Sequence, residues 1–378
     1  MRRLTPNRFH GVTRSMTAGL LVAVAAIILS LGPSVVQPAY ATSVSCGQTL
    51  DSGDFVLESD LGPCDDPTGA AALTVNGTVD TPATLDLAGF SVICQDLDGQ
   101  KGVPIGILIT GASVTVTNGT VIGCKVGVQV AGDGGHLVKN VTAENSTSSG
   151  FLIIKSDGNR INSATATGGL ADGFVVTGST NRVVHSTASN NALAGFNVSS
   201  GHNRVKSNTA TGNGGAGFVV DGSHTKVGAN TADGNTGPGF ALAADRNRVN
   251  TNTATANGGA GYDVTGNRTK LEENTASGNT GDGFTFIGSV NKVRGNTSDG
   301  NGGNGLAIAI TSSLNKLAGN ISNASGLVGI TVSGLSNRIK GNTAQSNAAM
   351  DLEDTNPNCQ SNRWKGNTFG TKSQSCIK

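Results

Sequence analysis

Positively charged residues recur through the second half of the chain at nearly constant spacing. They stand at the start of a repeated segment that first begins at Asn159, and consecutive starts lie 22 residues apart six times, then 24, 22 and 25. A regular array of Lys and Arg could bind a linear polyanion along its length. The candidates are Arg160, Arg182, Arg204, Lys206, Lys226, Arg248, Lys270, Lys292, Arg294, Lys316 and Arg338. The competing interpretation is that the charges are copied with the repeat and only keep an exposed strand soluble.

Carboxylates offer less for catalysis. Glycoside hydrolysis uses two carboxyl groups at a fixed separation. Asp172 and Asp282 each precede a Gly-Phe step, but five repeats separate them. If each repeat is one coil, that is roughly 24 Å, which is too far for the two to cooperate. Asp65 with Asp66, and Asp96 with Asp98, lie close together in the acidic N-terminal region, where carboxylates are usually solvated. We therefore assign no catalytic residue.

Histidine and cysteine are residue types that could bind a transition metal in this chain. His202 and His224 occupy equivalent positions one repeat apart, so their imidazoles would lie about 4.8 Å from each other. Two ligands do not close a metal site, and the cysteine spacings match no zinc motif. We expect no metal and no cofactor, and we interpret the two histidines as exposed turn residues.

All six cysteines are expected to form disulfides, because an even number of cysteines in an exported chain is typical of a disulfide framework. The short separations at the two ends of the chain suggest a clasp at each end. The middle pair follows similar strings, GFSVIC and GTVIGC, and should lie in consecutive coils, where a rise of about 4.8 Å fits a disulfide. The expected pairs are Cys46 with Cys64, Cys94 with Cys124, and Cys359 with Cys376.

One repeat, residues 203–224, reads as three short strands separated by turns. Alternation places Val205 inward with Arg204 and Lys206 outward, and Gly-Asn and Asp-Gly pairs mark the turns. Three strands and three turns in one short repeat predict an all-β, single-stranded parallel β-helix. An Asn row from Asn208 to Asn367 should form a ladder of amides at one turn, with Asn118 and Asn140 as its earlier members.

The repeat length, the Asn row and the G-F-x-V strands resemble right-handed parallel β-helix repeat proteins. The strings CGQTL, ESDLGPC, ATLDLAGFSVIC and VTVTNGTVIGCKVGVQV resemble the opening of exported bacterial members of the pectate-lyase-like superfamily. The resemblance covers roughly residues 46–378 and implies about 13 coils of about 22 residues. It also implies a range of activities, among them polysaccharide lyases, glycoside hydrolases, uronan epimerases and phage tailspikes. A fold does not choose among these, and the Asp-Pro-His-Asp string of uronan epimerases does not occur.

The N-terminus has the pattern of a secretory signal. Four Arg precede an apolar run of 14 residues, 18–31, and Ala39-Tyr40-Ala41 forms an A-x-A cleavage site. We expect residues 1–41 to be removed and residues 42–378 to form one β-helix domain outside the cytoplasm, whether secreted, periplasmic or on the cell surface. Its parts would be an N-terminal cap with longer first coils (42–110), regular coils (111–357) and a disulfide cap (358–378). The alternative is an uncleaved membrane anchor.

Charge is distributed unevenly along the expected mature chain. Residues 42–150 hold 12 acids against 3 Lys, whereas residues 151–378 hold 13 acids against 19 Lys and Arg. This asymmetry favours an anionic partner for the second half. We expect a non-catalytic exported protein that binds a linear acidic polysaccharide, with nucleic acid disfavoured and no membrane partner once the signal is cleaved. The alternatives are a polysaccharide lyase, glycoside hydrolase or uronan epimerase, and a structural protein of the cell envelope.

Overall fold

The computed structural model describes residues 43–64, 71–94 and 105–378. The chain divides into two compact units, and only the second, Ala41–Lys378, contains described residues. The expected signal peptide, residues 1–41, lies outside them and stays a prediction. Within the described part of the chain, no helix is long and apolar enough to cross a membrane.

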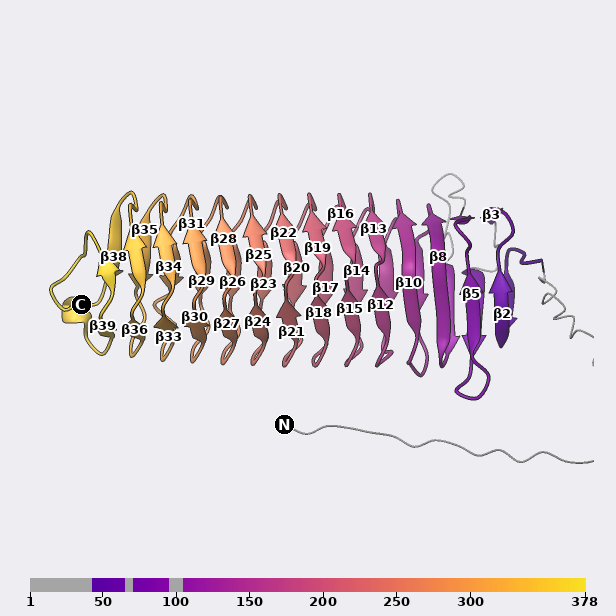
Figure 1. Ribbon diagram of the computed structural model, residues 1–378, viewed down its shortest axis with the longest axis horizontal. Helices are drawn as coiled ribbons and strands as arrows, with labels where there is room; N and C mark the ends of the chain where they lie inside the picture. Colours follow the sequence, from indigo (N-terminus) through magenta and orange to yellow (C-terminus); the bar gives the residue numbers. More distant parts are fainter. Residues whose placement is uncertain (1–42, 65–70, 95–104) are drawn as a thin grey trace, which may run out of the picture. The chain divides into compact units, whose positions relative to one another are not determined.

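The described residues form a solenoid whose strands wind around one axis in three parallel faces (Figure 1). The first, here called the phenylalanine face, is a sheet of 14 strands among the described residues. Its strands are β1 (Gln48–Asp51), β4 (Ala71–Gly77), β7 (Ile105–Gly111), β9 (Val126–Val130), β11 (Ser149–Ile153), β14 (Phe174–Val176), β17 (Phe196–Val198), β20 (Phe218–Val220), β23 (Phe240–Leu242), β26 (Tyr262–Val264), β29 (Phe284–Phe286), β32 (Leu306–Ile308), β35 (Val328–Val332) and β38 (Met350–Asp354).

The second face, here called the basic face, carries most of the charged repeat positions. Its strands are β2 (Gly53–Val56), β5 (Ala83–Asp86), β12 (Arg160–Asn162), β15 (Arg182–Val184), β18 (Arg204–Lys206), β21 (Lys226–Gly228), β24 (Arg248–Asn250), β27 (Lys270–Glu272), β30 (Lys292–Arg294), β33 (Lys316–Ala318), β36 (Arg338–Lys340) and β39 (Arg363–Lys365). Two longer strands, β8 (Val114–Ile122) and β10 (Leu137–Glu144), run around the corner into the third face.

The third face, here called the threonine face, completes each coil. It contains β3 (Leu61–Cys64), β6 (Ser91–Cys94), β13 (Thr165–Thr167), β16 (Thr187–Ser189), β19 (Thr209–Thr211), β22 (Thr231–Asp233), β25 (Thr253–Thr255), β28 (Thr275–Ser277), β31 (Thr297–Asp299), β34 (Ile321–Asn323), β37 (Thr343–Gln345) and β40 (Thr368–Phe369). A 3₁₀ turn, η1 (Pro357–Cys359), precedes the last coil. The predicted all-β parallel β-helix is therefore confirmed, with about one coil more than the 13 expected.

Strand alternation builds the core, because one residue of each three-residue strand on the basic and threonine faces points inward and its neighbours point outward. Val205 and Ala210 are buried, and so are Phe218 and Val220 on the phenylalanine face. Aromatic rings stack coil upon coil from Phe151 to Phe284, with centroids 4.6–4.8 Å apart. This spacing is the rise of one coil, and parallel pairing keeps every row in register.

Buried asparagines form ladders at all three corners, where the sequence predicted one. In the predicted ladder the Asn230 side-chain amide donates to Asn252 Oδ1 at 2.9 Å and to the Val205 carbonyl at 3.0 Å. A second ladder, which includes Asn159, precedes the basic strands, and a third runs from Asn191 to Asn301. The amides bond to each other and to backbone carbonyls of neighbouring coils, so these rows hold the coils together.

Asn118 and Asn140 do not belong to the predicted ladder, so that assignment was wrong. They are exposed and bond to each other at 3.1 Å, and both have positive φ. The ladder row is instead occupied in these coils by Gly119 and Val141, which pair with each other. The two asparagines fill the left-handed position just before the ladder, which Ser207 fills later. Asn tolerates that conformation well, which explains why it occurs there.

The three predicted disulfides are confirmed: Cys46–Cys64, Cys94–Cys124 and Cys359–Cys376, with Cα atoms 5.5, 5.0 and 6.1 Å apart. The first and third close loops near the two ends of the solenoid, and the second joins neighbouring coils. The domain limits proposed around them, including the cap boundaries, remain predictions.

Candidate functional site: a basic row along one face

A single row of cations, here called the basic row, runs along the basic face. Each member follows a residue of the buried second Asn ladder and opens a three-residue strand, so alternation turns its side chain outward. Parallel pairing places each member beside the next, for example Arg204 beside Lys226 and Lys226 beside Arg248. The row comprises Arg160, Arg182, Arg204, Lys226, Arg248, Lys270, Lys292, Lys316, Arg338 and Arg363.

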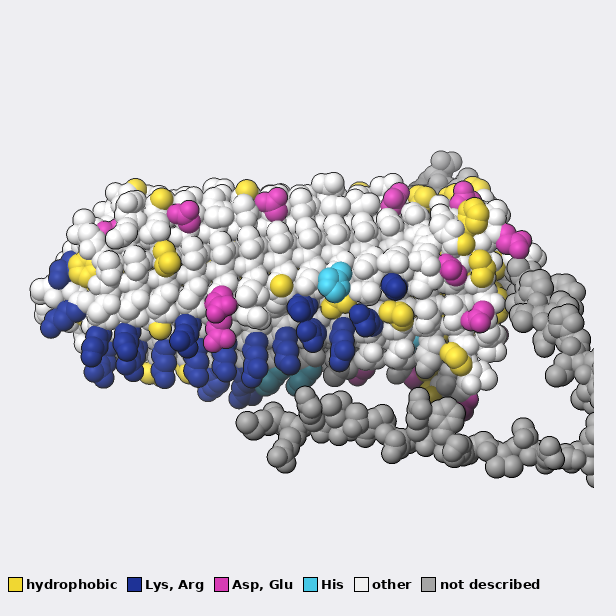
Figure 2. All heavy atoms as spheres, in the orientation of Figure 1, with side chains coloured by type: hydrophobic (Ala, Val, Ile, Leu, Met, Phe, Trp, Pro, Cys, Tyr) yellow, Lys and Arg dark blue, Asp and Glu magenta, His cyan; other side chains and the backbone are white. Residues whose placement is uncertain are grey.

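Figure 2 shows these side chains as a nearly unbroken line of blue along one edge of the solenoid. At a coil rise of 4.6–4.8 Å, two neighbouring charges repel by about 0.9 kcal/mol in water before salt screening. Among the described residues, no salt bridge neutralises a member of the row, and Glu272 is the acid that stands beside it on β27. The row therefore concentrates positive charge that the fold itself does not require.

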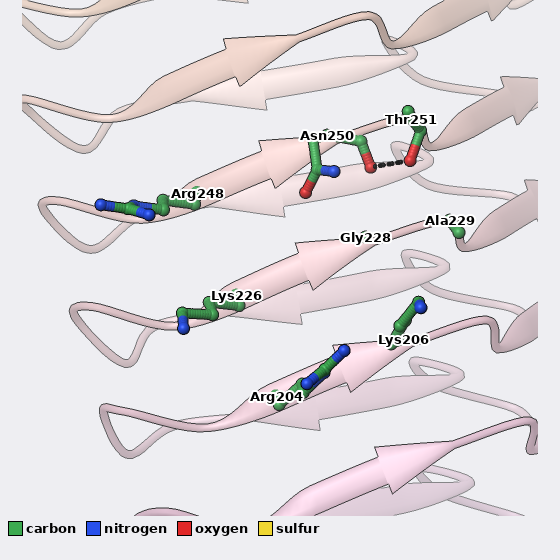
Figure 3. Close-up of a pocket in the computed structure, with 8 residues that line it drawn as sticks. All are labelled: Arg204, Lys206, Lys226, Gly228, Ala229, Arg248, Asn250 and Thr251. Carbon is green, nitrogen blue, oxygen red and sulfur yellow. Dashed lines mark hydrogen bonds between the residues drawn. The ribbon is translucent and has the colours of Figure 1, made fainter.

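A second file of outward residues, two positions further along each strand, shapes the surface beside the row. It supplies Lys206, Arg294, Lys340 and Lys365, but Gly228 leaves a gap on β21. A shallow depression of about 330 Å³ lies at this gap. Arg204, Lys226 and Arg248 line it from the neighbouring strands β18, β21 and β24 of the basic face. Lys206 lies beside Arg204 on β18 (Figure 3).

Two further depressions adjoin the first along the row. One, of about 300 Å³, is lined by Arg182, Arg204 and Lys226 together with both members of a histidine pair. The other, of about 220 Å³, is lined by Arg160, Arg182, Arg204 and Lys206. Arg204 lines all three, so the three depressions together span the row from Arg160 to Arg248.

The histidine pair lies where the sequence predicted it. The rings of His202 and His224 stack with centroids 5.0 Å apart and planes within 3° of parallel. The lone pairs of two parallel imidazoles lie in separate planes, so one metal ion cannot sit well in both. Across the described ranges, no group of three or more His, Cys, Asp or Glu could hold a metal ion. The pair instead widens the polar surface beside Arg204 and Lys226.

The turn position of these histidines carries two cations that sequence reasoning missed. Arg246 and Arg268 occupy it in the next two coils, each with positive φ and each two residues before a member of the basic row. Asp245 is the one nearby anion with a shifted pKa. The backbone N–H of Asn267, at 2.8 Å, lowers the pKa of that carboxyl, and Arg268 and Arg246 lower it further. In the sequence, both arginines could have been found from their place immediately before the Asn or Thr that starts each repeat, Asn247 and Thr269.

The acids considered for catalysis are separated and engaged in structural bonds. Asp172 accepts from the backbone N–H of Ala194 and the side-chain amide of Asn197. Asp282 lies five coils further along the solenoid than Asp172. It accepts hydrogen bonds from Asn304 and from the Thr285 hydroxyl. Asp65, Asp66, Asp96 and Asp98 lie outside the described residues. The acids that can be placed therefore form no cooperating pair.

Comparisons with known proteins agree with this architecture. Residues 105–254 and 241–369 match the family described as right handed beta helix region. No curated protein sequence matches the chain. The periplasmic alginate epimerase AlgG has a similar structure, with a TM-score of 0.51 at 14% identity over 86% of this chain and 85% of that one. The A-module of Azotobacter vinelandii mannuronan C-5 epimerase AlgE4 gives 0.42 at 12% identity over 86% and 90%. At such identities the likeness shows the fold alone.

Proposed function

The chain belongs to the right handed beta helix family, and on that premise we propose that it is an exported protein that binds a linear acidic polysaccharide along its basic row. The observation that carries this proposal is the row itself: ten cations in strict register at the coil rise, with no salt bridge among the described residues. A rigid line of like charges is matched by a ligand that repeats its own negative charges along a line.

Export is supported by two independent features. The three disulfides fit an oxidising compartment, since such bonds are rare in the cytosol. The Arg-rich and apolar N-terminal segment with its A-x-A site fits a secretory signal. Outside the cytoplasm an acidic polysaccharide is a more plausible polyanion for the row than nucleic acid.

The choice of polysaccharide over single-stranded nucleic acid also follows from the aromatic residues. Proteins that bind single strands present aromatic rings on which bases stack. Here the aromatic stack from Phe151 to Phe284 is fully buried in the core. A relative in fold, AlgG, is named for action on alginate, which is an acidic polysaccharide. That likeness supports the class of ligand and carries no residue over to this chain.

Binding without catalysis is favoured because the placed acids are held apart, and the depressions along the row are lined by cations. A triple variant tests the proposal: Arg204→Gln, Lys226→Gln and Arg248→Gln remove the three cations around the depression at Gly228. We expect polyuronate binding to weaken by more than about tenfold at low salt, because each charge contributes to the attraction of the whole chain.

The matched control removes three cations outside the basic row: Lys125→Gln, Lys155→Gln and Lys378→Gln. It has the same net charge as the first variant, so binding within about twofold of the unmodified protein shows that position matters. If both triple variants lost the same amount of polyuronate affinity, the loss would be due to net charge and not to the basic row. Shortened or epimerised polyuronate after incubation would favour the catalytic alternative, and no binding of any acidic glycan would favour a structural role.

A further inference from the structure

Five large aliphatic side chains are exposed at the same corner of three successive coils. Ile310 is 78% exposed and Leu314 55%, and Ile287, Val290 and Leu335 are exposed by 39–45%. All five lie between the phenylalanine face and the basic face, in the coils from β29 to β36. We call these five residues the apolar zone. Contiguous exposed apolar surface of this kind usually marks a contact site.

Two members of the apolar zone occupy a repeat position that holds His or Arg in the preceding coils. The left-handed turn position holds His202, His224, Arg246 and Arg268, and then Val290 and Leu314. Val290 has φ of 65° and Leu314 of 60°. A β-branched or bulky side chain is disfavoured in that conformation, where Gly or Asn fits more easily. The fold thus accepts local strain and apolar exposure at the same residues.

The longer repeat in this region projects the most exposed member. Asn291 and Asn315 are 24 residues apart where most repeats have 22, and Ile310 lies in that turn. Ser312 anchors the turn from inside: it is fully buried, donates to the Gly288 carbonyl, and accepts from the Asn315 side chain at 2.7 Å. The turn is therefore fixed in place while Ile310 faces outward.

The turns that carry the zone are hydrogen-bonded from coil to coil, and they lie directly beside the basic row. Val290 donates its backbone N–H to Ser313 at 2.9 Å, and Leu314 donates to Leu335 at 3.3 Å. Lys292 and Lys316 follow Val290 and Leu314 by two residues. In Figure 2 apolar side chains are visible among the blue ones on the same edge toward the C-terminal end. One straight edge thus combines aliphatic and cationic side chains.

We propose that this edge contacts the surface of an anionic lipid bilayer. Its aliphatic side chains would enter the boundary between headgroups and acyl chains, and Lys292, Lys316 and Arg338 would face the headgroups, which are the two contributions that hold peripheral proteins on membranes. A straight edge can meet a flat layer along its length, whereas a hydrated polysaccharide has no need of exposed aliphatics. This departs from the sequence-based expectation of no membrane partner. It shares three cations of the basic row with the proposed polysaccharide binding, but it also requires the aliphatic side chains, which that binding does not use.

Vesicle co-sedimentation tests the proposal with the mature exported protein. The vesicles contain phosphatidylcholine alone or with about 30% phosphatidylglycerol, an anionic composition of the kind that attracts basic segments. We expect binding to the anionic vesicles, reduced by more than about tenfold in Ile310→Ser with Leu314→Ser, because two aliphatic contacts are lost. The matched control is Leu170→Ser with Leu193→Ser, which removes side chains that are 67% and 52% exposed outside the zone; it should bind as the unmodified protein does.

Three outcomes would overturn the proposal. They are no binding to anionic vesicles, equal losses in the zone variant and the control, and a concentration-dependent dimer that dissociates in the zone variant, which would assign the zone to a second copy of the chain. Polyuronate binding of the zone variant should stay within about twofold. A failure here is therefore distinguishable from a failure of the polysaccharide proposal.

Discussion

The backbone N–H of His136 donates to the side-chain oxygen of Asn159 at 3.0 Å, so His136 is the first member of the buried ladder beneath the basic row. Its own Nδ1 accepts the backbone N–H of Val114 at 3.1 Å and must therefore be unprotonated. Burial lowers the pKa of His136 in spite of Asp133 nearby, which acts to raise it. The ladder thus begins at a neutral imidazole.

This arrangement predicts acid sensitivity of the fold. The unfolded chain has the ordinary His pKa of 6.5, and the folded pKa is lower. Between the two values the unfolded state binds more protons, so the stability from His136 is fully present above pH 6.5 and is lost as pH falls toward the folded pKa. In His136→Asn, an amide can still accept from Val114 without titrating. Denaturant midpoints at pH 7.5 and 5 should differ less in this variant than in the unmodified protein, and equal differences would contradict the role given to His136.

The predicted Asn ladder should be costly to interrupt. Asn252→Ala removes the acceptor of both the backbone N–H and the side-chain amide of Asn230, and the donor to Val227. Leaving buried donors unsatisfied costs about 1–3 kcal/mol each, so we expect a loss of about 3 kcal/mol or more. Asn250→Ala, exposed two residues earlier, should change stability by less than about 0.5 kcal/mol. Similar denaturant midpoints for the two variants would show that the ladder is not structural.

The rows of the regular coils could be predicted because residues one repeat apart occupy equivalent positions in successive coils. Val205, Arg204 and Asn208 each lie where the repeat places them. The first coils could not be aligned in the same way. Strands β8 and β10 continue around a corner, and matching Asn to Asn there shifted Asn118 and Asn140 by one position from their true register.

The cationic surface was predicted in part. The basic row follows from alternation within each strand, so Arg204 and Lys226 were identified as neighbours. Arg246 and Arg268 were missed because they lie in a turn, where left-handed backbone rather than alternation decides the direction of the side chain. The depression at Gly228 depends on side-chain volumes in three coils together, which a single repeat does not reveal.

The gap at Gly228 offers a test of charge in the depression lined by Arg204, Lys226 and Arg248. A Cβ added at Gly228 would meet the Asn250 side-chain oxygen at 3.1 Å, the mobile end of an exposed residue, so a longer side chain can be accommodated. Gly228→Glu should weaken polyuronate binding by about tenfold because it places an anion between Arg204 and Arg248. Gly228→Gln has the same shape without the charge and should bind nearly as the unmodified protein does. Equal affinities of the two variants would place the ligand elsewhere.

The most direct test of the central claim is the affinity for acidic oligosaccharides of defined length, measured calorimetrically at low and at physiological salt. Arg160 and Arg363, the two ends of the row, are nine coils apart, which is roughly 43 Å at the coil rise. The linear row predicts that affinity rises with oligosaccharide length up to about that span and falls steeply with salt. An affinity that is already maximal for a disaccharide, or that is insensitive to salt, would contradict it.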